Sequence, residues 1–180
     1  DDHVNNTPRQ INILKALGAV VPQYAHLSMI LGDDGQKLSK RHGAVSVTQY
    51  DDAGYLPEAV SNYLARLGWG HGDDECFSMQ QFVEWFALED VSPSPSRFDA
   101  DKLLWLNAQH IKQAELATLA ALVQPRLQAS GITLATGPDL ASALALVRDR
   151  VPDLNALARE ADYFYQRRTP SAEELDKHLS

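Results

Sequence analysis

The sequence predicts a mainly helical protein with an α/β portion towards its amino-terminal end. Three observations support this prediction. Apolar residues recur at helical spacing over most of the chain, glycine and proline punctuate these stretches, and one apolar run with strand character precedes a cationic loop. With 180 residues, of which 44% are hydrophobic and 22% charged, the chain is long enough for one sizeable core or two small ones.

The first 35 residues predict a helix followed by a strand. Thr7 is placed to cap the helix, Pro8 suits its first turn, and Gly18 can end it. The run 24–31 then alternates polar residues into an apolar stretch, which predicts a strand that ends at the glycine-rich turn 32–35.

The middle of the chain predicts three helices with loops between them. After a short extended piece at residues 45–47, the first helix opens at Pro57. The second begins at the capping box 78–81 and is expected to run through Phe86. The third, a short helix, is capped by Asp99.

Residues 111–180 predict a small helical bundle. Aromatic residues become rarer there, and alanine and leucine recur at helical spacing. Gly131, Gly137 and Pro152 supply the breaks, and a capping box at 171–174 opens a last helix. Since the chain also begins without an initiator methionine, we expect a piece of a longer protein.

Composition disfavours several classes of protein. No apolar run approaches the roughly 20 residues of a membrane-spanning helix, and the acidic start lacks the features of a signal peptide. The single Cys76 forms neither an internal disulfide nor a cysteine-based zinc site. We therefore expect a cytoplasmic protein with no membrane partner and no zinc site.

The net charge of −8 argues against a protein that coats nucleic acid by bulk attraction, although the acidic excess lies in residues 51–110. A polyanion would have to meet the first segment or local clusters of arginine in the last. The simpler interpretation of those arginines is a solvated helix face. They are Arg148, Arg150, Arg159, Arg167 and Arg168.

Residues 37–43, with the sequence KLSKRHG, place three fixed cations and a hydroxyl on one segment between glycines. Lys37, Lys40 and Arg41 offer charge-assisted donors to a phosphate, and Ser39 adds a neutral donor. Such a loop can bind a polyphosphate loosely and tighten as negative charge is redistributed in a transition state. Taken alone, however, the pattern is weak, and a basic surface loop is the more economical interpretation.

The neighbouring segments change that balance. The loop resembles the second signature of class I aminoacyl-tRNA synthetases, and residues 1–10 and 26–32 resemble the glutamyl-tRNA synthetase family. The downstream segments that resemble this family's stem-contact region are 54–59, 62–64, 67–69 and 98–107. The match thus follows the family's order over more than a hundred residues.

The resemblance implies three parts. Residues 1–31 would be the end of the Rossmann-like, nucleotide-binding catalytic domain, residues 32–110 the KMSKS-type loop and α/β stem-contact domain, and residues 111–180 the first part of an all-helical anticodon-binding subdomain. The first half of the catalytic domain and the last anticodon-binding subdomain would lie outside this chain. For that reason, the isolated fragment is expected to be inactive.

The resemblance also implies a glutamate–tRNA ligase. Such an enzyme makes glutamyl-adenylate from L-glutamate and ATP, which carries Mg²⁺, and passes glutamate to tRNA(Glu). Carried over by position, Lys40 matches the lysine that contacts ATP, and Lys37, Ser39 and Arg41 complete the catalytic loop. Leu38 and Arg41 depart from the usual Lys-Met-Ser-Lys-Ser pattern in a way that is usual for glutamyl enzymes.

Further residues match the nucleotide side of the family's site. Met29, Ile30 and Leu31 would present backbone groups to adenine, although a buried strand explains them equally well. Asp2 and His3 match residues near the amino-acid and ATP site.

Two other functions stay open. A glutaminyl-tRNA synthetase has a similar loop and stem-contact region but usually continues into β-barrels, whereas residues 111–180 predict helices. A non-catalytic tRNA-binding module could keep the stem-contact fold without the catalytic activity. An upstream His-x-Gly-His segment in the gene would indicate an enzyme, and its absence would indicate such a module. Whether tRNA(Gln) is also charged is left open.

Three groups of side chains have simpler interpretations than a site. The tryptophans sit among apolar residues at helical spacing and are predicted to pack in the core instead of stacking on bases: Trp69, Trp85 and Trp105. The acidic run 73–75 is predicted to be a solvated loop. The histidines whose spacing fits no common metal site are His3, His26 and His42.

Overall fold

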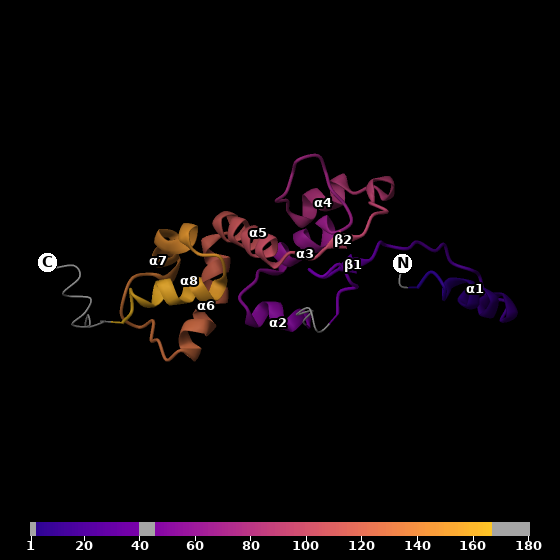
Figure 1. The fold of residues 1–180 in the computed structure, drawn as a ribbon. Helices are drawn as coiled ribbons and strands as arrows, with labels where there is room; N and C mark the ends of the chain where they lie inside the picture. Colours follow the sequence, from indigo (N-terminus) through magenta and orange to yellow (C-terminus); the bar gives the residue numbers. More distant parts are fainter. Residues whose placement is uncertain (1–2, 40–45, 167–180) are drawn as a thin grey trace. The chain divides into compact units, whose positions relative to one another are not determined.

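The computed structural model describes residues 3–39 and 46–166 of the chain. The chain divides into two compact units, each built from two stretches of sequence. The first unit comprises residues 1–47 and 57–106, and the second comprises residues 48–56 and 107–180. Figure 1 labels the helices and strands along the chain.

The elements follow one another along the sequence in an order dominated by helices. The α-helices are α1 (Thr7–Ala16), α2 (Val47–Asp52), α3 (Pro57–Arg66), α4 (Met79–Trp85), α5 (Ala100–Gln113), α6 (Leu116–Ala129), α7 (Leu140–Val147) and α8 (Leu154–Asp162). The strands are β1 (Ile30–Leu31) and β2 (Ser96–Arg97), and short 3-10 helices cover Leu88–Asp90 and Arg148–Arg150. No helix of the described residues is both long and apolar enough to cross a membrane.

Helix α1 confirms the first predicted helix but not its predicted cap. Asn6 occupies the position before the helix without a side-chain cap, and Thr7 is the first helical residue. The Thr7 hydroxyl donates to the carbonyl oxygen of His3 at 3.2 Å instead. Gly18 ends the helix with a φ of 67°, in the left-handed region that glycine adopts without strain.

The strand predicted for residues 24–31 is wrong for most of its length, because β1 contains only Ile30 and Leu31. It pairs in parallel with β2, which the sequence did not predict, with Ile30 opposite Ser96. The N–H groups of Ser96 and Phe98 face β1, whereas the next N–H in this alternation, that of Ser94, donates to the Ser92 hydroxyl at 3.2 Å, so the ladder does not extend in that direction.

The short extended piece predicted at residues 45–47 is also wrong where it is described. Val47 begins helix α2, and Val45 lies outside the described residues. The β-branched side chain suggested a strand, but this weak preference is overridden by the tertiary context of the segment.

Local capping signals correctly predicted where α4 and α5 begin. The Ser78 hydroxyl accepts from the Gln81 backbone N–H at 3.1 Å, and the Gln81 side chain accepts from the Ser78 N–H at 2.9 Å, which confirms the capping box. The Asp99 carboxylate caps α5 by accepting from the Lys102 N–H at 2.9 Å. Helix α5 is longer than predicted, at 14 residues.

The core of the first unit forms where α3 meets the aromatic residues that follow it. Its buried apolar residues include Ala59, Tyr63, Leu67, Trp69, Phe77, Leu103 and Leu106. Asn62, also buried, donates to the Glu75 carbonyl at 3.1 Å and accepts from the Phe77 N–H at 3.0 Å. Both ends of its amide are therefore satisfied, which makes its burial tolerable.

The three tryptophans have different environments. Trp69 is 5% exposed, which confirms the prediction of core packing, and Trp85 is half-buried with its ring stacked 4.3 Å from that of His71. Trp105 is 42% exposed, so the core prediction is wrong for this residue. The Lys102 ammonium lies 4.0 Å from the centre of its ring, a cation–π contact that suits a surface position.

The acidic run 73–75 is not simply solvated. The Asp74 carboxylate lies 3.2 Å from the His71 ring, and the Glu75 carboxylate lies 2.6 Å from the Lys102 ammonium. This hydrogen bond from Lys102 lowers the pKa of Glu75. Glu75 therefore ties the loop to α5, whereas the prediction left it in solvent.

The second unit is a helical bundle, as predicted for the residues described. Its core comes from α6, α7 and α8, and it includes Leu119, Val123, Leu127, Leu144, Leu154 and Leu157. Pro152 and Gly137 lie between these helices, as expected of helix breakers. The last predicted helix, from residue 171, lies outside the described residues.

Residues 48–56 are held in the second unit by a buried asparagine. Asn107, which is fully buried, accepts from the Leu56 N–H at 2.8 Å and donates to the Pro152 carbonyl at 2.7 Å. Gly54 has a φ of 88°, and a Cβ there would lie 2.9 Å from the Asn155 nitrogen. The segment therefore depends on one buried amide and one close backbone approach.

Replacing Asn107 with alanine should reduce the free energy of unfolding by about 3 kcal/mol. The substitution leaves the Leu56 N–H and the Pro152 carbonyl buried without their partner. Urea denaturation of the chain measures the difference. The control Asn12→Ala, on the exposed face of α1, should change stability little, and an equally small effect at Asn107 would contradict the role given to this amide.

Stability should also depend on the charge of Glu75. Because the folded-state pKa of this carboxyl is lowered from its ordinary value of 4.5, its contribution is present above that pH and is lost as pH falls through the folded value. The wild-type chain should therefore be more stable than Glu75→Gln at pH 7, with the difference shrinking in acid. Thermal unfolding at pH 7 and at pH 3 measures it, and a pH-independent difference would refute this assignment.

Candidate functional site

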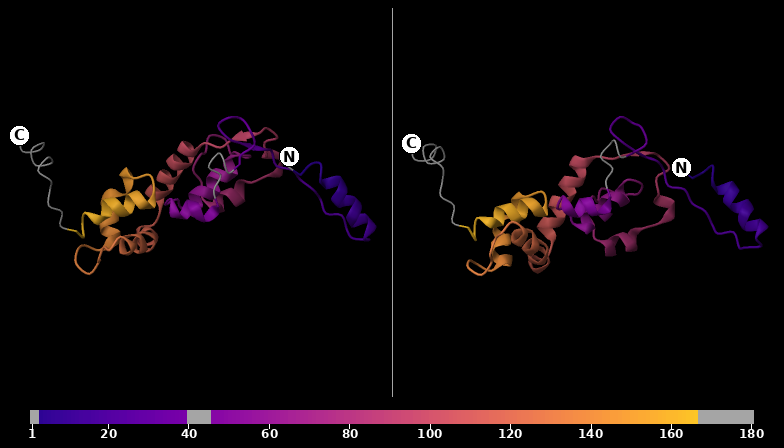
Figure 2. Two further views of the ribbon diagram at one scale, coloured as in Figure 1. Left: turned by 60° about the horizontal axis from the view of Figure 1, so that its bottom comes forward. Right: turned by 90° about the horizontal axis from the view of Figure 1, so that it is seen from below.

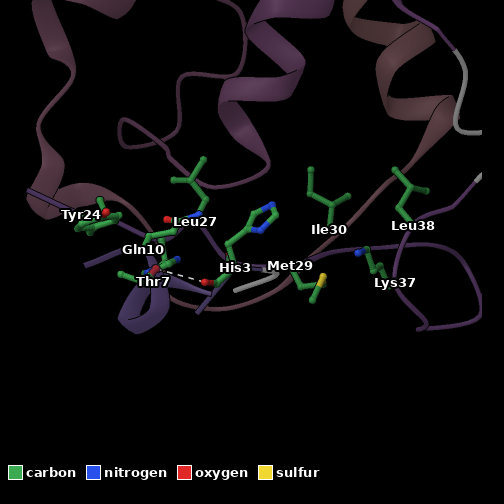
Figure 3. A pocket seen from close by; sticks show the side chains of 12 residues that line it. His3, Thr7, Gln10, Tyr24, Leu27, Met29, Ile30, Lys37 and Leu38 are labelled. Atoms are coloured by element: carbon green, nitrogen blue, oxygen red, sulfur yellow. Dashed lines mark hydrogen bonds between the residues drawn. The ribbon is translucent and has the colours of Figure 1, made fainter. Parts of the chain in front are cut away.

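An open cavity of about 690 Å³ lies in the first unit, between the start of α1, the segment before β1 and the residues that follow the turn 32–36. Its lining includes His3, Thr7, Gln10, Met29, Ile30, Lys37 and Leu38. In Figure 3, the His3 ring and the side chains of Ile30 and Leu38 point to one side, while the side chain of Met29 points to the other. This alternation is expected of extended backbone, in which successive side chains face opposite ways.

A tight turn brings the cationic loop back beside β1. The Gly32 N–H donates to the Gln36 carbonyl at 2.8 Å, and the Gln36 N–H donates to the Asp34 carboxylate at 2.9 Å. The Leu38 N–H then donates to the Ile30 carbonyl at 2.8 Å. The turn thereby places the beginning of the loop along the strand, as the predicted order of strand, turn and loop requires.

The structure brings several of the predicted site residues together. Met29, Ile30 and Lys37 line the cavity with His3, although these residues come from separate segments of the chain. Lys37 is exposed, and Ser39 is half-buried at the end of the described part of the loop. Ile30 and Leu31 form β1, as the alternative interpretation of a buried strand requires, although the side chains of Met29, Ile30 and Leu31 are only half-buried.

Other predicted residues are not placed by the structure, or are placed elsewhere. Leu31 does not line the cavity. Asp2, Lys40, Arg41 and His42 lie outside the described residues.

Eight of the residues that line the cavity were missed by sequence reasoning as site residues: Thr7, Gln10, Tyr24, Ala25, His26, Leu27, Ser28 and Leu38. The Thr7 hydroxyl lies 3.0 Å from Nε2 of His26, nineteen residues further along the chain. No spacing rule marks such a contact. The available signal was indirect, since both residues fall in segments, 1–10 and 26–32, that carry the family resemblance.

The amino-terminal wall of the cavity is built from His3. The Asn6 side-chain amide donates to Nδ1 of His3 at 3.1 Å, which leaves the ring proton on Nε2. Among the residues that the structure describes, no group of three or more His, Cys, Asp and Glu side chains is arranged to hold a metal ion.

A second, smaller cavity of about 180 Å³ in the first unit is surrounded by the cations Arg66, Arg97 and Lys102. Arg66 and Lys102 are engaged by Glu75, at 3.7 and 2.6 Å. The side chain of Arg97, on β2, is exposed. In the second unit, Arg148 is half-buried and donates to the Ala114 carbonyl at 2.9 Å, so this arginine is not simply part of a solvated face.

Comparison with known proteins gives concordant matches. The model of the family described as tRNA synthetases class I (E and Q), catalytic domain, matches residues 1–105. The glutamate–tRNA ligase of Chromobacterium violaceum is 66% identical over all 180 residues, and that of Dechloromonas aromatica is 64% identical. The chain spans 39% of the length of each of these curated relatives.

Solved structures share the fold. A glutamate tRNA ligase from Elizabethkingia meningosepticum, in complex with its amino acid, aligns with 99% of this chain and 39% of its own, at a TM-score of 0.78 and 24% identity. The glutamate-tRNA synthetase from Elizabethkingia anophelis aligns with 98% of this chain and 39% of its own, at a TM-score of 0.77 and 25% identity.

The family model covers more than half of the chain, including the cavity and the whole cationic loop. The mainly helical fold with a small parallel sheet agrees with the solved relatives. The chain therefore belongs to the class I tRNA synthetases specific for glutamate and glutamine.

Proposed function

We propose that this chain is part of a glutamate–tRNA ligase and carries one half of its ATP site. One observation carries the proposal: Lys37, at the start of the signature loop, lines the same cavity as His3, Met29 and Ile30. The relatives that are 58–66% identical over the whole chain are glutamate–tRNA ligases, which favours glutamate as the amino acid.

The proposed reaction has two steps. A carboxylate oxygen of L-glutamate attacks the α-phosphorus of ATP, which enters with Mg²⁺ as part of the substrate, and pyrophosphate leaves. The 3′-terminal ribose of tRNA(Glu) then attacks the carbonyl carbon of glutamyl-adenylate, and AMP leaves. In the first step, negative charge moves onto the leaving pyrophosphate, and cations placed there lower the barrier by electrostatic stabilisation.

The cationic loop suits that task. We assign the triphosphate to Lys37, Ser39, Lys40 and Arg41, with Lys40 as the principal contact. Lys37 is exposed at the cavity, so an anionic substrate can reach its ammonium group from solvent. The turn 32–36 supports the assignment because it fixes where the loop leaves β1.

The adenine side is assigned to Met29, Ile30 and Leu31, with Asp2 and His3 near the amino acid and ATP. The carbonyls of Met29, Ile30 and Leu31 each already accept a backbone hydrogen bond, from Ser96, Leu38 and Phe98 respectively. Adenine contact would therefore use a remaining lone pair or N–H, together with the apolar side chains. Ile30 and Leu38, which point to the same side of the extended backbone, suit the face of a base.

We also propose the subdomain layout for the parent enzyme. Residues 1–31 would end the nucleotide-binding domain, residues 32–110 would form the loop and stem-contact domain, and residues 111–180 would begin the anticodon-binding helices. The exposed Arg97 beside a small cavity supports contact with the tRNA backbone in the middle part. The α6–α8 bundle is compatible with a helical subdomain in the last part.

A glutaminyl enzyme is the nearest alternative, because the matched family includes both specificities. The helices from residue 116 to residue 162 argue against continuation into a β-barrel at this point. A non-catalytic tRNA-binding module would require that the full gene lack the upstream half of the active site. An upstream His-x-Gly-His segment in the gene would exclude that module.

Lys40→Ala in the full-length enzyme should reduce ATP–pyrophosphate exchange about a hundredfold, with L-glutamate and tRNA(Glu) present. Loss of an ion pair to phosphate costs about 3 kcal/mol of transition-state stabilisation, and each 1.36 kcal/mol is tenfold in rate. The melting temperature should not change.

Lys15→Ala, an exposed lysine on α1, is the matched control and should exchange at the wild-type rate. Wild-type exchange by Lys40→Ala would refute the assigned role of the loop.

Arg97→Ala should weaken tRNA(Glu) binding by the full-length enzyme and reduce the salt dependence of the binding constant by about one unit of slope. The reason is the loss of one phosphate contact and of the counterion that it releases. Filter binding over a series of salt concentrations measures both quantities. An unchanged slope would remove Arg97 from the tRNA surface.

A further inference from the structure

The segment that leads from α1 into β1 lacks regular structure of its own. Figure 2 shows it running from the end of α1 back toward β1 as an extended trace. Within the part of the chain that the structure describes, residues 20–26 make no backbone-to-backbone hydrogen bond. Side-chain contacts must therefore set where this segment lies along α1, and with it the position of the cavity residues that follow.

One hydroxyl supplies such a contact. The Thr7 hydroxyl donates to the His3 carbonyl at 3.2 Å and lies 3.0 Å from Nε2 of His26. Because a hydroxyl can both donate and accept a hydrogen bond, Thr7 can bond to the His26 ring in either tautomer of that ring.

The three linked residues hold three parts of the cavity wall together. His3 belongs to the turn before α1, Thr7 is the first residue of α1, and His26 precedes Met29 by three residues. All of them line the cavity, and so do Met29 and Ile30. Fixing His26 against Thr7 thus limits how far Met29 and Ile30 can shift relative to His3.

The hydrogen bond between Thr7 and His26 is expected to restrain local conformation more than to stabilise the fold. His26 is exposed and Thr7 only half-buried, so the pair adds little to the hydrophobic core. An exposed hydrogen bond contributes weakly to the free energy of unfolding, but it can decide which of several local arrangements is populated. The expected consequence of its loss is therefore a change in ligand affinity more than a change in folding.

We propose that Thr7 and His26 are positioning residues for ATP, and that their hydrogen bond holds the adenine side of the cavity in its binding arrangement. The inference rests on the proposed function, because it takes the cavity to be the nucleotide site. Neither residue needs to touch the reacting atoms. If the bond is lost, only a fraction of molecules has the binding arrangement, and the apparent dissociation constant for ATP rises in inverse proportion to that fraction.

The test uses the full-length enzyme and two substitutions that remove the bond while keeping shape. Thr7→Val lacks the hydroxyl, and His26→Phe keeps a ring but has no ring nitrogen to form the bond. In ATP–pyrophosphate exchange with tRNA(Glu) present, each should raise the KM for ATP about fivefold, with kcat and the KM for glutamate within twofold of wild type. Loss of binding without loss of turnover gives this pattern.

Rescue and coupling separate positioning from general damage. Thr7→Ser keeps the hydroxyl and His26→Gln keeps an amide that can donate or accept at the end of the side chain, so both should restore the KM for ATP to within twofold of wild type. The double variant Thr7→Val with His26→Phe should be no worse than the poorer single variant, because both remove the same bond. Thr118→Val, at an exposed position on α6, is the matched control.

Each outcome decides the inference. The positioning role is overturned if the single variants have an unchanged KM for ATP, or if their effects simply add in the double variant. In either case, glutamate-dependent exchange by the wild-type enzyme would still support the proposed function. A rise in KM that is matched by a fall in melting temperature also overturns it, since the role would then be structural. A wild-type enzyme without glutamate-dependent exchange would instead overturn the proposed function, and the inference with it.

Discussion

The first unit depends on a parallel pairing of only two residues in each strand. The bonds from Ser96 to the Met29 carbonyl and from Phe98 to the Leu31 carbonyl join segments that lie more than sixty residues apart. The Ser96 hydroxyl also donates to the Leu67 carbonyl at the end of α3. Strand β2 thus connects the cavity wall to the helical core of the unit. Its pairing with β1 also fixes where the turn that follows β1 begins.

One carboxylate pairs with two of the cations near that strand. Glu75 contacts both Arg66 and Lys102, and its position is set in turn by Asn62, which holds the backbone on either side of Cys76. Two cations around the small cavity are thereby partly neutralised, whereas Arg97 stays exposed. The chain as a whole is acidic, yet local pairing decides which cations are presented to a polyanion.

Features encoded in neighbouring residues were predictable from sequence, and features that need a distant partner were not. The capping box of α4 and the Asp99 cap of α5 depend on residues three apart, and both are present. The extent of β1 depends on a partner strand that begins at Ser96, because the N–H of Ser94 bonds to Ser92 instead, and no pattern near residue 30 could reveal this. Similarly, the loop and its lysine could be recognised locally, whereas the contact between Thr7 and His26 exists only once the chain has turned back on itself.

Residues 48–56 belong to the second unit, although they lie between the two stretches that form the first. The chain leaves the first unit after residue 47, returns to it at residue 57 and leaves it again after residue 106. No single cut separates the units, and a fragment that began at Asn107 would lack the Leu56 N–H that its buried amide accepts from. Recombination between homologous enzymes that replaced the second unit would therefore have to exchange residues 48–56 together with the stretch from residue 107.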